Sequence, residues 1–234
     1  MIALMEIINV MLKTMLDYFF GFTQNYGVAV VLLSLAVTVV TLPLNIKQMQ
    51  FTRAMRRIQP ELDEIKKKYK DDKVKINEAT VALWSKYKVN PASGCLPMLI
   101  QMPVLWAMFN VLRIPDIFSK QPYFFGLNMT MPSPEVAIMT LPWFYWILPV
   151  LTVGTTFWQS KQTMQSTDPS ARTMLYIMPL FMGWFTLQFP TALALYWVSR
   201  NVFTVGQEYL YAMFVSRGTV EVEAGTSEKR RKDR

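Results

Sequence analysis

The chain has 234 residues, of which 52% are hydrophobic and only 17% charged, and its formal net charge is +8. This composition is more apolar than that of a typical soluble domain and fits a protein that faces lipid. Histidine is absent and Cys95 is the only cysteine, which excludes a disulfide framework, a thiolate or imidazole metal cluster, and a Ser-His-Asp or Cys-His catalytic set.

The first expected element is an amphipathic helix within residues 1–25. Its apolar side chains recur at helical spacing, while Glu6, Lys13 and Asp17 interrupt the apolar run. A signal peptide would instead have a basic start, an uncharged core and a cleavage site of small residues. We therefore expect this helix to lie in the membrane interface rather than to cross the bilayer.

Residues 26–46 are expected to form the first membrane span. Their core, residues 28–44, is an apolar run whose helical length approaches the ~30 Å of a bilayer core. Ser34, Thr38 and Thr41 share one face of this helix. Such a polar stripe is satisfied either by packing against other helices or by lining a polar cavity, and the stretch by itself leaves both interpretations open.

Residues 47–90 differ in kind, because they contain twelve Lys or Arg residues against six acidic residues. Two apolar patterns of helical period flank the turn sequence KDDK at 70–73. This predicts a soluble helical hairpin. Pro60 is expected to kink or divide its first helix.

Four more apolar segments predict the remaining spans, all within residues 91–213. These segments are 95–112, 141–159, 173–188 and 191–213. The loop 114–140 has one basic residue, whereas the hairpin and the tail 214–234 are rich in them, so the positive-inside rule places hairpin and C-terminus in the cytoplasm and the N-terminus outside. The predicted fold class is all-α, a polytopic membrane protein with five transmembrane helices, an N-terminal interfacial helix and a cytoplasmic helical hairpin.

Four motifs resemble the YidC/Oxa/Alb family of membrane-protein insertases. They are NPASGCLPMLIQMPVLWAMF at 90–109, TLPLNIKQMQ at 41–50, FFGLN at 124–128 and FPTALALYWVSRN at 189–201. The motifs occur in the family's order and cover nearly the whole chain. The resemblance implies a minimal core form with a groove between the spans, which is polar, open to the cytoplasm and to lipid, and closed on the outer side.

One position departs from the family pattern. The resemblance implies an Arg on the first core span, inside the groove, but the matching residue is Thr38. Arg200 lies ten residues after Pro190, roughly 15 Å along a helix. An Arg at bilayer depth costs at least ~2.5–3.5 kcal/mol and rarely faces lipid. We expect Arg200 to lie in the water-filled groove and to replace the missing charge; the alternative is that it snorkels to the cytoplasmic interface or caps backbone carbonyls.

Further candidate groove residues follow from the same match. Trp197 shares a helix face with Arg200 and matches a groove position of the family. Gln159 matches another groove position or lies at the cytoplasmic interface, and Gln101 is expected either to bond another span or to line the groove. The candidate groove residues are thus Arg200, Trp197, Thr38, Gln159, Gln101, Ser34 and Thr41, with Asn45 at the cytoplasmic end.

The basic segments suggest partners. The candidate contacts on the hairpin are Arg53, Arg56, Arg57, Lys66 and Lys67. The resemblance implies that the hairpin guides substrates and meets targeting machinery or a Sec-type channel; the alternative is a solvated hairpin or one resting on anionic lipid. The tail sequence EKRRKDR is expected either to meet ribosomal RNA or to act as a topology anchor.

The expected function is that of a membrane-protein insertase and chaperone, not an enzyme, in the bacterial inner membrane, with an organellar membrane as the less favoured location. Short hydrophilic ends of nascent proteins would enter the groove, and apolar segments would leave through a lipid-facing opening between the third and fifth spans. No cofactor, metal or small-molecule substrate is expected. The alternatives are a structural assembly chaperone and a small channel or transporter.

Overall fold

The computed structural model describes residues 2–70, 72–87, 96–118, 122–130, 143–163 and 169–232. Its elements in chain order are α1 (Ile2–Thr23), α2 (Tyr26–Val40), α3 (Leu42–Tyr69), α4 (Lys73–Lys86), α5 (Leu96–Leu112), η2 (Pro115–Phe118), β1 (Tyr123–Phe124), β2 (Leu127–Asn128), η4 (Trp143–Trp146), α6 (Ile147–Thr163), α7 (Pro169–Thr186) and α8 (Thr191–Lys232). The prediction of a mainly helical fold is confirmed, while the short β1–β2 hairpin was not expected from the sequence.

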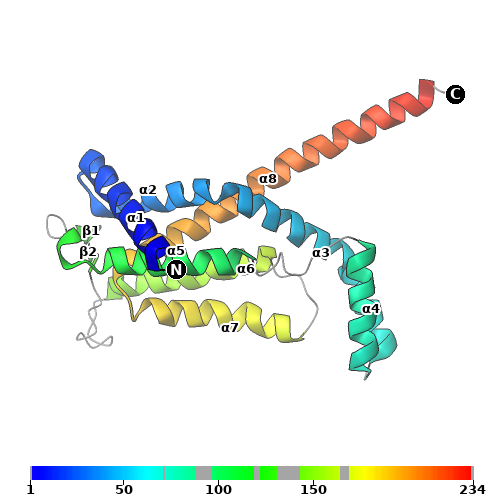
Figure 1. The fold of residues 1–234 in the computed structure, drawn as a ribbon, viewed down its shortest axis with the longest axis horizontal. Helices are drawn as coiled ribbons and strands as arrows, with labels where there is room; N and C mark the ends of the chain where they lie inside the picture. Colours follow the sequence, from blue (N-terminus) through cyan, green and yellow to red (C-terminus); the bar gives the residue numbers. More distant parts are fainter. Residues whose placement is uncertain are drawn as a thin grey trace.

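A bundle of helices forms the body of the molecule, with α3 and α4 projecting from one end (Figure 1). The helix α2 packs on α1 and α8, α6 packs on α7 and α8, and α5 packs mainly on α1. Ala29, Val30 and Leu33 of α2 are fully buried in the core beside Met108 of α5 and Tyr196 of α8. The helices α2 and α8 therefore lie at the centre, with α5 on one side and α6 and α7 on the other.

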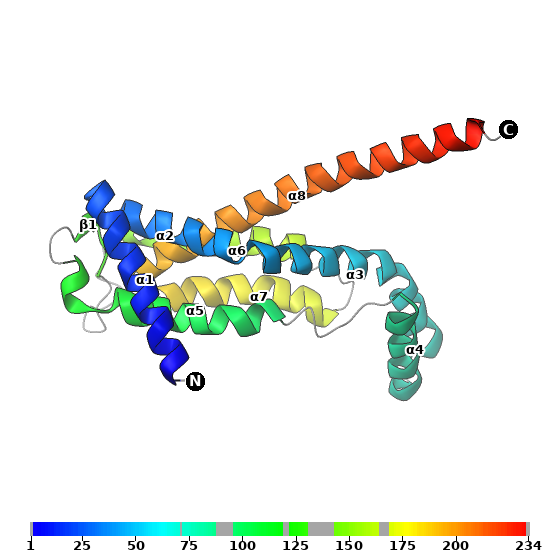
Figure 2. The ribbon, with the colours of Figure 1, turned by 45° about the horizontal axis from the view of Figure 1, so that its top comes forward.

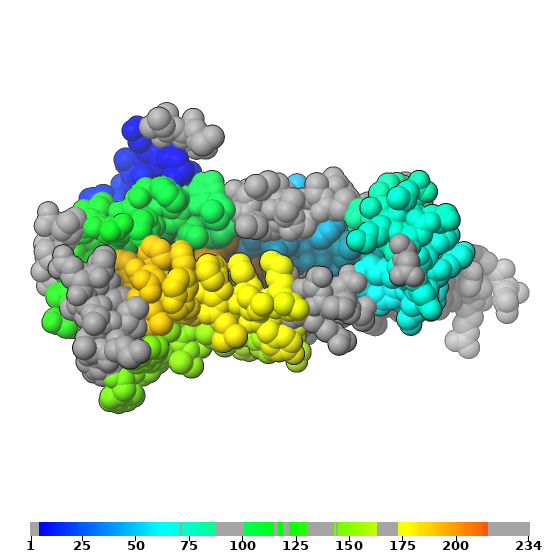
Figure 3. All heavy atoms as spheres, turned by 90° about the horizontal axis from the view of Figure 1, so that it is seen from below, coloured from blue at the N-terminus to red at the C-terminus, as the bar shows by residue number. Residues whose placement is uncertain are grey.

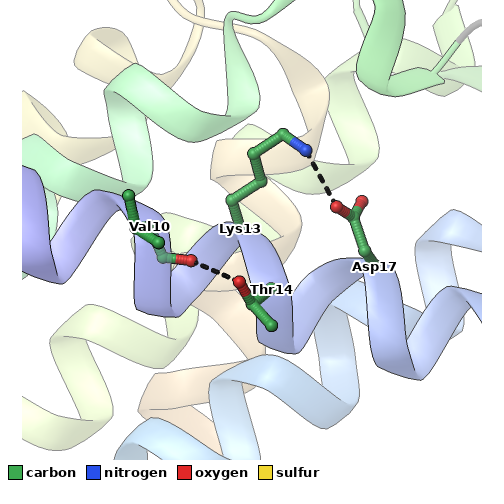
Figure 4. A network of polar contacts seen from close by, with 4 residues as sticks. All are labelled: Val10, Lys13, Thr14 and Asp17. Atoms are coloured by element: carbon green, nitrogen blue, oxygen red, sulfur yellow. Dashed lines mark hydrogen bonds and ion pairs between the residues drawn. The ribbon is translucent and has the colours of Figure 1, made fainter.

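The helix α1 crosses one side of the bundle (Figure 2). It buries Leu12 and Leu16 against the core. Its exposed side carries Lys13, whose Nζ lies 2.9 Å from Asp17 Oδ2 one helical turn further on (Figure 4). Two of the three charges that interrupt the apolar sequence thus pair with each other on the surface.

The segment expected to be one continuous first span is divided between two helices. The helix α2 ends at Val40 and α3 begins at Leu42, with their axes bent by 64°. Pro43 explains the break, because it has no N–H to donate to the carbonyl four residues earlier. Thr41 Oγ1 donates to two carbonyls of the last turn of α2, at 2.9 and 3.2 Å.

In the described part of the chain, none of the helices taken singly combines the length and the hydropathy of a membrane crossing, whereas α2 and α3 do so as a bent pair.

The helices α3 and α4 form the hairpin. Ile58 and Leu62 of α3 are buried against Leu83 of α4. Glu61 accepts hydrogen bonds from Tyr87 and from Lys86, and the Tyr87 bond is the main cause that holds the pKa of Glu61 below its ordinary value. The carboxylate is therefore ionised at neutral pH and ties the two helices together. Pro60 lies inside α3 without dividing it.

Residues 122–130 form a cap at the bundle end opposite the hairpin (Figure 2). Phe124 packs so closely over Gly27 of α2 that a Cβ there would lie 2.0 Å from its ring. The Asn128 N–H donates to the Tyr145 hydroxyl at 2.9 Å, and the Ala192 N–H of α8 donates to the Met129 carbonyl at 3.0 Å. The cap thus joins α2, η4 and α8.

Two predicted features lie partly outside the described residues. These are the first part of the 90–109 motif, up to Cys95, and the predicted loop 114–140, of which 119–121 and 131–140 are not described. The predicted tail belongs to α8 as far as Lys232, and its basic side chains also lie outside the described part.

Close packing of α6 on α7 depends on Gly183. A Cβ at this position would lie 2.3 Å from Val153 Cγ2 and 3.4 Å from the Pro149 carbonyl oxygen. We expect Gly183→Leu to destabilise the protein by about 1–3 kcal/mol, because overpacking forces the helices apart. Gly154→Leu on α6 is the matched control, since no atom lies within 4 Å of a Cβ there. Thermal unfolding in detergent compares the two, and equal transition temperatures would contradict the packing account.

Candidate functional site

A polar cavity of about 180 Å³ lies where α3, α5, α6 and α8 approach one another. This volume holds several water molecules. Two of the lining residues, Leu44 and Val104, are wholly apolar. The others are Thr41, Asn45, Gln48, Gln101, Gln159, Trp197, Arg200, Asn201 and Thr204. An interior of this composition is what a hydrated groove requires.

The surface of the bundle has a furrow bordered in part by helices that also line the cavity (Figure 3). Figure 3 shows this furrow between α5, in green, and α7, in yellow, with α8 and α3 at its floor. The helices α5 and α7 do not pack extensively on each other over the described residues, whereas α6 packs closely on both α7 and α8. The opening expected between the third and fifth spans, which are α6 and α8, is therefore closed. The furrow lies between the second and fourth.

One wall of the cavity is fixed by hydrogen bonds between α8 and α6. The Trp197 indole N–H donates to Thr156 Oγ1 at 3.3 Å. The Asn201 amide donates to Thr155 Oγ1 at 3.1 Å and to Thr156 Oγ1 at 3.0 Å. Thr156 thus accepts from two side chains, and these bonds set the rotation of α8 that directs its polar face into the cavity.

A second set of bonds fixes the break between α2 and α3. Asn45 Nδ2 donates to Gln207 Oε1 at 2.9 Å, and Gln207 Nε2 donates to the Thr38 carbonyl at 3.2 Å. The carboxamide of Gln207 therefore joins α8 to the last turn of α2 and the first turn of α3. Sequence reasoning missed Gln207, although it lies seven residues after Arg200 and so shares its helix face.

Several polar atoms at the cavity have no hydrogen-bond partner within the described protein. They are Gln101 Nε2, Arg200 Nη1 and Thr204 Oγ1. The buried Tyr196 hydroxyl lies near Gln101 and Arg200 and interacts with both side chains. Buried polar groups are nearly always bonded to protein or to water. Each of these three atoms exposes less than 1 Å² to solvent, so their residues reach the cavity mainly through their other atoms. The described lining contains no acidic side chain, so nothing there neutralises Arg200.

The structure places the predicted groove residues in two groups. Arg200, Trp197, Gln159, Gln101 and Thr41 line the cavity together, as does Asn45. The prediction that the whole stripe of the first span lines a groove does not hold in this structure.

Ser34 and Thr38 form the second group. Both are 0% exposed. Thr38 Oγ1 donates to the Ser34 carbonyl at 2.6 Å, and Ser34 Oγ donates to the Val31 carbonyl at 2.7 Å. Because each hydroxyl bonds its own helix, these two residues take the packing alternative, and the cavity begins only at Thr41.

The five basic residues predicted to make contacts on the hairpin also fall into two groups. The Arg53 guanidinium lies 4.6 Å from the centre of the Tyr211 ring of α8. Arg56 has a buried Nε, and both arginines interact electrostatically with Glu208 of α8. These two belong to the junction between α3 and α8. The remaining candidates lie further along α3, with Arg57 and Lys67 exposed and Lys66 in the last helical turn.

Comparisons with known proteins agree with this architecture. Residues 18–217 match the family model described as 60Kd inner membrane protein. A protein of Caldanaerobacter subterraneus subsp. tengcongensis named "Membrane protein insertase YidC" is 35% identical over 207 residues, which cover 88% of this chain and 95% of that protein. A longer protein of the same name from Syntrophobacter fumaroxidans is 36% identical over 83% of this chain, which spans 36% of the relative.

A solved structure has the same fold. It is described as "Active YidC insertase crystal structure with the first transmembrane domain resolved" and matches with a TM-score of 0.69 and 25% identity. The match covers 87% of this chain and 46% of that chain.

Two threonines one turn apart on α6 test the polar wall. Thr156→Val leaves the Trp197 N–H without its acceptor and removes one acceptor of Asn201, so we expect a loss of about 1 kcal/mol in unfolding free energy. Thr152 is equally buried, but its Oγ1 has no partner, so Thr152→Val should be neutral or stabilising. Chemical unfolding in detergent measures both, and a reversed order would refute the assigned bonds.

Proposed function

This chain belongs to the YidC family of membrane protein insertases, and we propose that its cavity accepts the hydrophilic ends of nascent membrane proteins on their way across the bacterial inner membrane. The observation that carries this proposal is a cavity lined mostly by polar residues, Arg200 and Gln101 among them, inside an otherwise apolar bundle. Such groups offer a passing polypeptide hydrogen-bond partners that hydrocarbon lacks. The barrier to moving polar backbone partway across is lowered in this way.

The exterior of the bundle supports a membrane location. Large apolar side chains are exposed on the outside of several helices, including Trp106 of α5, Val150 of α6, and Ile177, Leu180 and Trp184 of α7. Apolar surface on this scale is stable when it faces lipid rather than water. We propose that α2, α5, α6, α7 and α8 form five spans, that α1 lies in the interface, and that the hairpin and C-terminus are cytoplasmic.

The route of the substrate follows from where the bundle is open. The cap ties α2, η4 and α8 together at one end, which favours entry from the hairpin end. Both helices beside the furrow carry exposed apolar residues, among them Trp106 of α5 and Leu180 of α7. Apolar segments of the substrate therefore leave sideways into lipid between these helices, while the hydrophilic end stays in the cavity.

Arg200 supplies the positive charge that the family resemblance implies on the first core span. Its Nη1 is buried at the cavity, which argues against snorkelling to the interface. Thr38 carries no charge, and its buried hydroxyl is bonded to the Ser34 carbonyl. Arg200 thus attracts acidic hydrophilic ends, with a strength that the water in the cavity limits.

The proposed partners beyond nascent chains belong to the cytoplasmic surface. The exposed Arg57 and Lys67 of the hairpin are positioned to meet targeting machinery or a Sec-type channel. The basic tail at the end of the chain adds a possible site for ribosomal RNA, since Lys and Arg bind phosphate without sequence preference.

Reconstitution of the purified chain into liposomes tests the function. The substrate is a single-span protein with a short acidic outer end, paired with a version in which Asn and Gln replace the acids. We expect Arg200→Gln to lower insertion of the acidic substrate several-fold, in line with about 1 kcal/mol for a hydrated charge pair, and to affect the neutral version little. The exposed Arg57→Gln is the matched control.

The two parts of the proposal fail separately. If the unaltered chain inserts neither substrate, the insertase activity is refuted, and a scaffold or assembly role takes its place. If Arg200→Gln inserts the acidic substrate as fast as the unaltered chain, only the role of the charge is wrong.

A further inference from the structure

The cap carries an exposed aromatic residue in a strained turn. The strands β1 and β2 pair Phe124 with Leu127, which leaves Phe125 and Gly126 as a two-residue turn. Their φ angles are 49° and 80°. This is the pattern of a type I′ turn, for which the sequence Asn-Gly is best suited. Phe125 therefore occupies the left-handed region, where a bulky side chain is disfavoured.

The base of the turn holds the tip in place. Phe124 fills the space above Gly27 on α2, and its ring meets the Phe125 ring edge to face with centres 4.6 Å apart. The Asn128 N–H bond to Tyr145 fixes the returning strand. The tip therefore projects from an anchored base.

The Phe125 side chain gains little stabilising contact with the rest of the folded chain. Its side chain is 91% exposed, so the contact with Phe124 covers only a small part of the ring. An aromatic side chain that is both exposed and held in an unfavourable backbone conformation indicates a contact made outside the chain.

Other exposed aromatic residues lie at the same end of the bundle and come from different elements. Tyr123 precedes the turn, Tyr18 and Phe22 belong to the last part of α1, and Trp143 begins η4 with 79% of its surface exposed. These elements extend across the width of this end (Figure 1). A protein partner would cover one face, whereas a lipid interface meets all sides, and Trp and Tyr concentrate there.

We propose that the β1–β2 turn is a lipid anchor, in which Phe125 inserts among the headgroups and upper acyl chains of the outer leaflet and fixes the depth of the cap. This inference rests on the membrane orientation given under the proposed function. The partner is the bilayer itself, and the anchor adds to the insertase a fixed position for the closed end of its cavity.

A fluorophore at the tip measures the depth. Phe125→Cys in a Cys95→Ser background carries one environment-sensitive label, because Cys95 is the only native cysteine. In liposomes we expect nitroxide lipids to quench this label and aqueous iodide to leave it largely unquenched. The same label on Thr130→Cys, an exposed polar position of the cap, should respond in the opposite way. Iodide quenching at position 125, or quenching by neither agent, overturns the anchor.

Phe125→Asn separates an anchor from a packing role. Asparagine suits the turn better, so we expect the variant to unfold in detergent at the same or a higher temperature. In liposomes, a label on Tyr123→Cys should become at least twofold more accessible to iodide. A lower unfolding temperature with unchanged accessibility would show that Phe125 serves the fold. Insertion assayed on the same liposomes distinguishes this failure from failure of the insertase proposal.

Discussion

A guanidinium held among apolar helices must be hydrated or paired, and the rest of the structure is arranged around this requirement. No carboxylate of the described lining reaches Arg200, so the bundle leaves space at its side rather than a counter-ion. The space persists because α8 is fixed to α6 through Thr156 and to α2 and α3 through Gln207. These bonds hold the polar face of α8 open without filling the cavity with side chains.

Sequence reasoning singled out Arg200 from its charge within an apolar run, whereas the groove around it was implied by the family resemblance. A lone arginine in an apolar run is conspicuous, and helical periodicity placed Trp197 on its face. The same reasoning failed for Ser34 and Thr38, since a hydroxyl can bond a carbonyl of its own helix and its position on a face does not reveal which choice it makes.

Contacts between distant segments were harder to predict. The hydropathy of α5, α6, α7 and α8 does not indicate which of these helices contact one another. The lateral opening was therefore predicted between α6 and α8, which pack together in the structure. Gln207 was missed for a similar reason, because its partners lie more than 160 residues away. The break at Thr41 has a local signal in Pro43, yet the first span was predicted to continue past it to residue 46.

Because α3 is one helix, it connects the hairpin directly to the wall of the cavity. This one helix includes Leu44, Asn45 and Gln48 on the cavity rim and continues through its 28 residues to the hairpin. With Thr41 as the pivot, the rim lies within roughly 10 Å of it and the far end of α3 roughly 40 Å away. The helix thus acts as a second-class lever, with the rim between the pivot and the hairpin, so that a displacement at the hairpin becomes a smaller displacement with a larger force at the rim. A weak push by anything docked on the hairpin would act on the cavity mouth as a small, strong movement.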